Sequence, residues 1–209
     1  KLLVDSISFR FPGRRLLLRN LSFEISDGQT LAVTGKSGSG KCLLMQLRLR
    51  SLPLWKGTVK IALIGVILDV PVDRRGFTAH VPQQVYLFEG NLLENITIDQ
   101  DISSWTRARK MCDIRGFTPF FECLPEGLHT VVGPHQFQLS GGQRQLLGVA
   151  RAIFRKPGLL LLDESTSAMD EEMTETVRTA LEMIRPDMII LWVTNDPAIV
   201  SWCDLKLDL

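Results

Sequence analysis

The chain has 209 residues with a formal net charge of +1, and 45% of its residues are hydrophobic. This length supports one sizeable hydrophobic core, and the balanced charge gives no electrostatic argument for a nucleic acid or an acidic membrane surface as a partner. The four cysteines form no C-x-x-C pair, which argues against a zinc site or a disulfide framework and favours a reducing compartment.

The first 34 residues predict antiparallel strands that lead into a buried one. Alternating apolar and polar residues over 2–11 predict a first strand, and residues 16–18 and 21–25 predict two further short strands. Asp27-Gly28 is typical of a turn, and the apolar run Thr30–Thr34 predicts a buried strand. The helix-forming residues 43–49 follow a glycine-rich segment.

That segment is the strongest candidate binding site, and it consists of Gly35, Lys36, Ser37, Gly38, Ser39, Gly40, Lys41 and Cys42. A strand, a glycine-rich turn and a helix that opens on Lys are the context of a phosphate-binding P-loop. The glycines let backbone N–H groups converge on one point, the helix N-terminus adds partial positive charge, and Lys41 adds a full charge. The pattern predicts a polyphosphate site. The alternative is a glycine-rich strand–helix connection that binds no ligand.

The middle of the chain predicts strands and then a helical segment. Residues 58–61 and 77–81 have strand patterns, and the second ends at Pro82-Gln83-Gln84, while the apolar run Ile61–Leu68 is also strand-sized. From Phe88 to Arg155 the apolar spacing becomes helical, with several breaks. We expect an inserted helical subdomain whose aromatic residues form its own core.

Residues Leu139 to Gln143 open the last helix of that segment. Ser140 and Gln143 have the spacing of a capping box, and Gly141 and Gly142 leave the backbone donors of the helix N-terminus uncovered. The pattern is compatible with a second anion site and equally with a helix that is only well capped.

Four consecutive leucines run into two acids, Asp163 and Glu164. A continuous apolar run predicts a central parallel strand, and acids at its carboxyl end lie where α/β sheets bind ligands. Because adjacent residues on a strand point apart, one acid can face a metal and the other an attacking water. The alternative is a solvated strand end. A surface helix over 171–184 and a strand over 188–193 complete an alternation that predicts a mainly parallel sheet.

Together these motifs, in this order, resemble the nucleotide-binding domain of ATP-binding-cassette (ABC) transporters over essentially all 209 residues. The resemblance implies an α/β fold of the P-loop NTPase class, with a mainly parallel central sheet, an N-terminal antiparallel β subdomain and an inserted helical subdomain. It places the ATP-binding core and β subdomain at residues 1–83 and 157–209, and the helical subdomain at residues 84–156.

The resemblance also implies roles for single residues, with ATP and Mg²⁺ as the cofactors. Phe11 corresponds to the aromatic residue that stacks on adenine, although by itself it reads as a half-buried strand residue. The cofactor-binding residues are Phe11, the eight P-loop residues Gly35 to Cys42, and Ser140, Gly141, Gly142 and Gln143, which cap the γ-phosphate bound by a partner domain. The metal-site residues are Cys42, Gln83 and Asp163. The catalytic residues are Glu164 as general base, Gln83 and Asn195.

Two of these positions depart from the family pattern. Cys42 replaces the Ser or Thr whose hydroxyl coordinates Mg²⁺, and a thiol is a poor ligand for that hard ion. Asn195 stands where the family has its switch histidine, and Asn cannot carry a proton's charge. We expect hydrolysis at this chain's own P-loop to be slow, whether the two residues are natural or engineered.

Residues 86–96 and Thr130–Gly133 resemble the exporter subtype, although the glutamates usual in the second stretch are missing. The implied partners are a membrane-spanning domain, contacted through Gln83–Ile96, and a second nucleotide-binding domain in a homodimer or heterodimer, with no nucleic acid. No apolar run approaches the roughly 20 residues that cross a bilayer, and no signal peptide is recognisable. The resemblance implies that the chain lies at the cytoplasmic face of a membrane, as the soluble domain of a membrane protein.

The resulting hypothesis is an exporter ATPase domain that binds MgATP, dimerises and hydrolyses it to drive transport. One alternative is a regulatory domain that binds ATP and gates a channel or partner with little hydrolysis; the retained Glu164 argues against it. Another is a soluble ABC-type ATPase of DNA repair or translation, which usually carries long coiled coils, and no heptad insertion is visible here. The transported substrate does not follow from these residues.

Overall fold

The computed structural model describes residues 1–10, 13, 16–36, 38–48, 56–63, 66–69, 77–133 and 135–209. It contains two compact units, Lys1–Arg75 with Arg185–Leu209, and Gly76–Ile184. The first unit holds the segment before the P-loop and the C-terminal strands, and the second holds the helical segment with two strands. The functional division at residues 83/84 and 156/157 stays a prediction.

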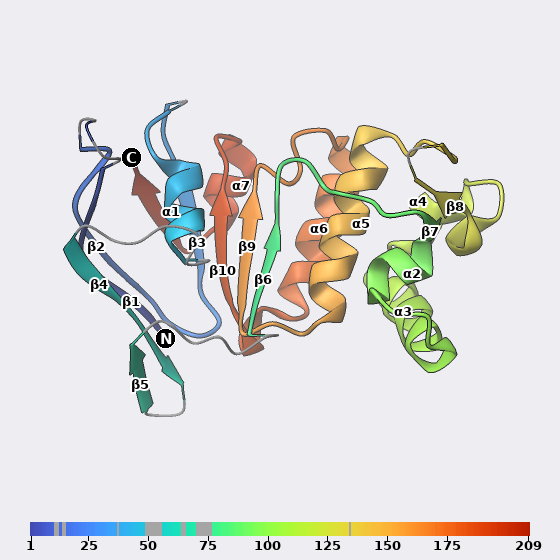
Figure 1. Ribbon diagram of the computed structural model, residues 1–209, viewed down its shortest axis with the longest axis horizontal. Helices are drawn as coiled ribbons and strands as arrows, with labels where there is room; N and C mark the ends of the chain where they lie inside the picture. Colours follow the sequence, from blue (N-terminus) through green and yellow to red (C-terminus); the bar gives the residue numbers. More distant parts are fainter. Residues whose placement is uncertain are drawn as a thin grey trace. The chain divides into compact units, whose positions relative to one another are not determined.

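The first unit contains an antiparallel sheet in the order β2-β1-β4-β5 (Figure 1). Its strands are β1 Leu2–Phe9, β2 Leu18–Ile25, β4 Lys56–Leu63 and β5 Val66–Asp69. The apolar run Ile61–Leu68 does not form one strand, because Ile61 of β4 pairs with Leu68 of β5. The predicted antiparallel character of this part of the chain is confirmed.

Two short strands were expected where the structure has the single strand β2. Asn20 lies in the polar stretch between the two expected strands. Its backbone has φ of +48°, and its N–H donates to Ser8 Oγ over 2.9 Å, so the strand continues through this position. Asn tolerates this left-handed conformation better than most residues. The irregularity is therefore a bulge within a continuous strand, where the β1–β2 register shifts between Ile7 and Phe9.

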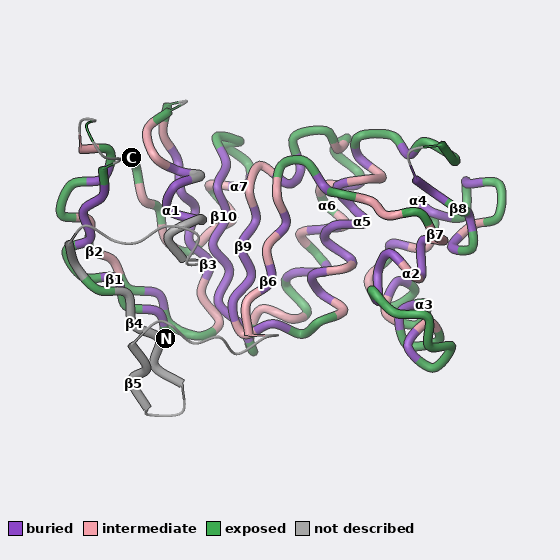
Figure 2. Tube along the Cα trace, viewed as in Figure 1, coloured by how far each residue is buried: buried purple, intermediate pink, exposed green. Residues whose placement is uncertain are grey.

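Three parallel strands of the same unit carry the P-loop. β3 Thr30–Thr34 pairs with β10 Ile189–Val193 on one side and with β11 Leu205–Asp208 on the other. All residues of β3 and β10 are buried, as Figure 2 shows. The helix α1 Lys41–Arg48 follows β3 through the glycine-rich loop, so the predicted order of strand, loop and helix is confirmed.

The helix α7 Pro197–Trp202, between β10 and β11, was not predicted. Asp196 caps its N-terminus by accepting a hydrogen bond from the Ala198 N–H over 2.9 Å, and Pro197 occupies the first helical position. Asp followed by Pro is a recognised start of a helix, so this signal was present in the sequence. The short 3₁₀ helix η2 Arg185–Asp187 precedes β10.

In the second unit, β6 Thr78–Val81 pairs in parallel with β9 Leu159–Asp163. All four leucines of β9 are buried, as the apolar run predicted. Two amphipathic helices belong to the same unit, α5 Gly141–Phe154 and α6 Glu171–Glu182, and α5 packs against β6, α6 and the helical segment. The parallel strands, the antiparallel sheet and these helices confirm the α/β class.

The helical segment consists of α2 Leu92–Thr97, α3 Ile102–Arg115, α4 Thr118–Glu122 and the 3₁₀ helix η1 Gly127–His129. The two-residue strands β7 Gly90–Asn91 and β8 Val131–Val132 pair within it. Phe117 and Phe121 are fully buried, so these aromatic residues form part of its core as expected. Within the described ranges, no helix has both the length and the apolar character needed to cross a bilayer.

Candidate nucleotide-binding site

The loop after β3 has the backbone conformation that its glycines permit. Gly35, Gly38 and Gly40 have φ values of +146°, +80° and +108°. A Cβ added to Gly35 would lie 2.4 Å from the carbonyl oxygen of Leu209, whereas one added to Gly38 would meet nothing within 4 Å. Gly35 is therefore required by a close backbone approach, and Gly38 leaves its face of the loop open to a ligand.

Lys41, the first residue of α1, is only 6% exposed and lies across this loop. Its ammonium group donates to the carbonyl oxygens of Gly35, over 2.6 Å, and Lys36, over 3.1 Å. Among the described residues no carboxylate forms an ion pair with it. A buried cation whose partners are neutral carbonyls keeps its positive charge available for an anion.

Asn195, at the position of the family's switch histidine, lies beside the same loop. Its Oδ1 accepts a hydrogen bond from the Gly35 N–H over 3.2 Å. Both residues line a cavity of about 560 Å³, together with Thr34, Lys36, Pro197, Val200, Lys206 and Asp208. The structure therefore brings Asn195 to the P-loop, as its assigned role requires.

The second unit brings together Gln83 and Glu164, for which the family resemblance implies roles at the attacking water. The Gln83 side-chain N–H donates to Glu164 Oε2 over 2.9 Å. Glu164 follows the last residue of β9, Asp163, and has φ of +45°. We expected strand alternation to separate the two acids. Instead Glu164 has left the strand and lies in a turn, which sets its direction independently of the pleat.

The imidazole of His80, in β6, belongs to the same unit as these acids. Burial lowers its pKa, and the negative charge of Asp163 offsets this only in part. Its Nε2 is buried and has no hydrogen-bond partner among the described residues. Burial therefore favours the neutral form of His80, which is a half-buried residue of β6.

Residues 139–143, the signature segment of the family pattern, lead into the signature helix α5 with the predicted capping box. Ser140 Oγ accepts from the Gln143 N–H over 3.1 Å, and Gln143 Oε1 accepts from the Ser140 N–H over 3.1 Å. A Cβ on Gly142 would lie 2.9 Å from the carbonyl oxygen of Ala168, and one on Gly141 would lie 3.0 Å from the Ala168 Cβ. These glycines therefore permit close packing against Ala168. Gly141 is exposed as expected, whereas Gly142 is buried.

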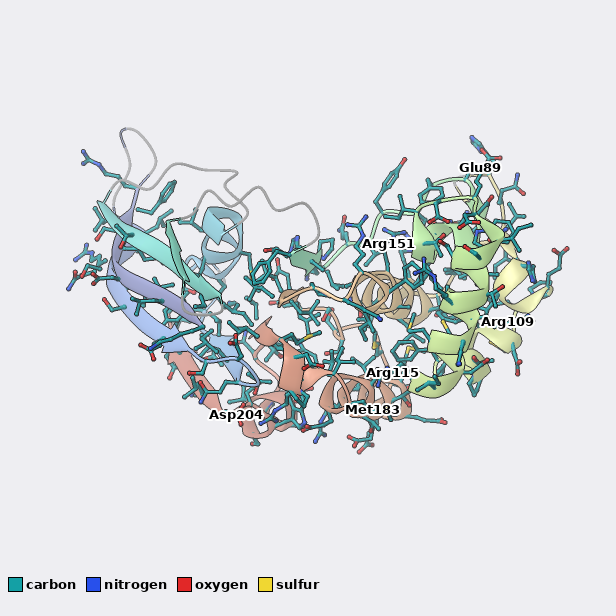
Figure 3. All side chains as sticks on the ribbon, turned by 90° about the horizontal axis from the view of Figure 1, so that it is seen from below. Glu89, Arg109, Arg115, Arg151, Met183 and Asp204 are labelled. Atoms are coloured by element: carbon teal, nitrogen blue, oxygen red, sulfur yellow. The ribbon has the colours of Figure 1, made fainter. Side chains whose placement is uncertain are left out.

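Sequence reasoning missed two polar residues further along α5, Gln145 and Arg151. Gln145 is 5% exposed and contacts the Gln83 and Glu164 segments. Arg151, labelled in Figure 3, donates from Nε to the Asn95 carbonyl over 2.7 Å and from Nη1 to the Tyr86 carbonyl over 3.0 Å. Gln145 is one of the buried residues of α5, and a polar residue among the apolar positions of an amphipathic helix was the available signal.

Not every predicted site residue can be placed. Phe11 and Ser37 lie outside the described residues, and Cys42 is described only as the second residue of α1. Lys36 and Ser39 lie in the loop, where the Ser39 N–H donates to the Lys36 carbonyl over 3.1 Å. The roles assigned to all these residues stay predictions.

The oxygen donors expected for Mg²⁺ are the Asp163 carboxylate and the Gln83 amide oxygen, which belong to one unit. The Gln83 amide uses its N–H toward Glu164, so its carbonyl oxygen is the group oriented away from that bond. Among the described residues, no cluster of three or more His, Cys, Asp or Glu side chains could enclose a metal. This donor set fits an ion held mainly by phosphates and water, as Mg²⁺ usually is.

Comparison with known proteins agrees with this geometry. The sequence model of the ABC transporter family matches residues 18–167. A putative export ATP-binding/permease protein from Rickettsia bellii is 33% identical over 192 residues, which are 91% of this chain and 33% of that protein. An ATP-dependent lipid A-core flippase from Photobacterium profundum is 34% identical over 206 residues, which are 96% of this chain and 35% of the flippase.

Among solved structures, a bacterial Atm1-family ABC exporter with ATP bound superposes on this chain with a TM-score of 0.87 and 26% identity. The match covers 100% of this chain and 36% of the exporter. The chain thus spans about a third of the length of these relatives. The family match covers well over half of the sequence and includes the P-loop, the signature segment and the two acids. The chain therefore belongs to the ABC transporter family and is an ATP-binding domain of that family.

Proposed function

We propose that this domain binds ATP with Mg²⁺, pairs with a second nucleotide-binding domain and hydrolyses ATP to drive export across a membrane. The observation that carries the proposal is the buried Lys41 ammonium, which lies on neutral carbonyls at the start of a helix. The β- and γ-phosphates of ATP supply the anion that this group lacks among the described residues.

Each element of the site has a distinct task in this reaction. Backbone N–H groups of the P-loop and Lys41 orient the phosphates, and the Ser140 end of α5 caps the γ-phosphate held by the partner domain. Glu164 accepts a proton of the attacking water, while Gln83 fixes the carboxylate through their hydrogen bond. The water oxygen then bonds to the γ-phosphorus as the bond to ADP breaks. When bound, Mg²⁺ neutralises developing charge on the phosphate oxygens.

We further propose that the P-loop of this chain turns over slowly. The Cys42 thiol does not replace a hydroxyl ligand for Mg²⁺, and Asn195 cannot supply the positive charge of a protonated histidine. The signature segment matches the family pattern without a substitution, and Glu164 is present at the position of the general base. A heterodimer is consistent with this asymmetry, because a partner with a better P-loop would use this chain's signature.

The membrane partner is proposed to contact the segment Gln83–Ile96. Tyr86 in this segment is 76% exposed, an unusual environment for a large aromatic side chain. The relatives are named as an export permease protein, a lipid A-core flippase and an exporter, which supports export over the regulatory alternative. The domain would then lie at the cytoplasmic face of the membrane.

Nucleotide binding and hydrolysis by the full-length protein test this function. We expect Lys41→Met to weaken ATP binding at least about tenfold, because the variant loses a charge-assisted contact to the phosphates. Lys110→Met, at an exposed position of α3, is the matched control. No affinity for ATP at millimolar Mg²⁺ would contradict the proposal. Tight binding without detectable single-turnover cleavage would instead favour the regulatory alternative.

A further inference from the structure

The amide of Gln145 is a buried junction between three segments of the second unit. Its Nε2 lies 3.1 Å from Ser167 Oγ, 3.4 Å from the Glu164 carbonyl oxygen and 3.5 Å from the Gln83 carbonyl oxygen. Its Oε1 accepts from the Ala168 N–H over 3.0 Å. Two amide protons serve three acceptors if one proton is shared, so both ends of this side chain are engaged.

Gln145 contacts the turn that begins at Glu164, which belongs to no helix or strand. Glu164 has φ of +45°, a strained conformation for a non-glycine residue that persists only when the surrounding structure fixes it. The Glu164 carbonyl accepts from the Ser167 N–H over 3.1 Å within the turn and from Gln145 outside it. Gln145 therefore stabilises the turn that sets the direction of the Glu164 carboxylate.

The face of α5 that carries Gln145 also contacts residues 83–86, called the Gln83 segment here. A Cβ on Gly148 would lie 2.6 Å from Val85 Cγ2, so the two backbones approach closely there. One turn later, Arg151 donates to the Tyr86 carbonyl. Residues at spacing of three share a helix face, so α5 contacts this segment at its start, middle and end.

We propose that Gln145 is a positioning residue for hydrolysis, acting through Glu164 and Gln83 rather than by touching ATP. It sets the Glu164 turn and the Gln83 backbone so that their side chains form the 2.9 Å hydrogen bond. Because Gln145 lies on the signature helix, a displacement of that helix changes the same bond. The capping of ATP by Ser140 is thereby linked to the aim of Glu164. This inference rests on the proposed role of Glu164 in hydrolysis.

Two variants of the full-length protein separate positioning from packing. Gln145→Glu keeps the acceptor for Ala168 and the side-chain shape but loses both donors, and Gln145→Met loses every hydrogen bond. We expect the single-turnover cleavage rate of both to fall by roughly tenfold to a hundredfold, the effect of a misplaced catalytic group. The dissociation constant for ATP should stay within about twofold. Gln100→Met, at an exposed position of the same unit, should change neither quantity.

A double variant supplies a readout that a structural role would not move. If Gln145 acts through Glu164, adding Gln145→Met to Glu164→Gln should lower the cleavage rate no further. Additive losses, an unchanged rate in both Gln145 variants, or a loss that only follows the folded fraction in thermal melts would overturn the inference. If Glu164→Gln itself leaves the rate unchanged, the proposed role of Glu164 fails first. If Glu164→Gln lowers the cleavage rate and both Gln145 variants keep the rate of the unchanged protein, only the inference fails.

Discussion

The Oδ1 atom of Asn195 accepts a hydrogen bond from the backbone N–H of Gly35 over 3.2 Å. The side-chain oxygen of Asn195 thus satisfies the backbone donor of one P-loop residue, and the amide stays neutral at every pH at which the protein folds. A histidine here would bring a group that can gain a proton near neutral pH. The chemistry at this position is therefore set by a residue that contacts the loop without contributing charge.

Restoring both unusual positions should accelerate hydrolysis. We expect Cys42→Ser combined with Asn195→His to raise the steady-state rate of ATP hydrolysis at least about tenfold, because the serine hydroxyl is an oxygen ligand for Mg²⁺ and the histidine adds charge near the γ-phosphate. The single variants show which position limits the rate. A flat rate in a double variant that still binds ATP would mean that neither residue limits the chemistry.

The close contact at Gly148 should make alanine costly there. Its added Cβ would lie 2.6 Å from Val85 Cγ2, and Val85 is buried. We expect Gly148→Ala to lower the free energy of unfolding by about 1–3 kcal/mol, as overpacking usually does. Chemical denaturation measures this change. The double variant Gly148→Ala with Val85→Ala should recover part of the loss; an equal or greater loss would show that the clash is elsewhere.

Asp204, also labelled in Figure 3, should give the first unit a pH-dependent stability. Burial raises the pKa of its carboxyl group, but hydrogen bonds from the Thr30 N–H and hydroxyl and from Arg185 outweigh this and lower it from 3.8. A carboxyl group with a lowered folded-state pKa stabilises the protein above the unfolded-state pKa and loses this effect as pH falls through the folded-state value.

We therefore expect Asp204→Asn to destabilise the protein most at neutral pH, with a difference that shrinks below about pH 4. The free energy of unfolding of both proteins, measured from pH 3 to pH 7, tests this. Asp187→Asn, at an exposed position of η2, is the control and should have little effect. A difference that is constant with pH would assign the role of Asp204 to shape rather than charge.

The cysteines should react with alkylating reagents in a fixed order. Cys123 is exposed, whereas burial raises the pKa of the Cys112 thiol to about 12 and that of the Cys203 thiol to about 11. Because the thiolate is the reactive species, we expect Cys123 to be labelled first at pH 8 and Cys112 only after unfolding. Mass spectrometry of a Cys42→Ser background measures this, and early labelling of Cys112 would contradict its burial.

The elements that the sequence predicted well are those specified by local pattern. The buried strands β3, β9 and β10 follow from unbroken apolar runs, and the start of α5 follows from the spacing of Ser140 and Gln143. The candidate site was likewise found through motifs that are contiguous in the chain, although the placement of Phe11 and Ser37 lies outside the described residues.

What the sequence did not reveal depends on contacts between distant residues. The continuity of β2 rests on a bond from Asn20 to Ser8, and the direction of Glu164 rests on a turn rather than on the strand before it. Gln145 looked like one more polar residue in a helix, because its partners are 19 to 62 positions away. Such roles become visible only when the chain is folded.

Leu209, the residue that follows strand β11, affects how variants of this domain behave. The Leu209 N–H donates to the Thr34 carbonyl over 3.0 Å, and the Leu209 carbonyl is what leaves room only for glycine at position 35. The backbone conformation of the P-loop thus depends on residues about 170 positions later in the chain. A random mutational screen for weakened ATP affinity should return changes at positions 205–209, even though no phosphate is assigned to any side chain there.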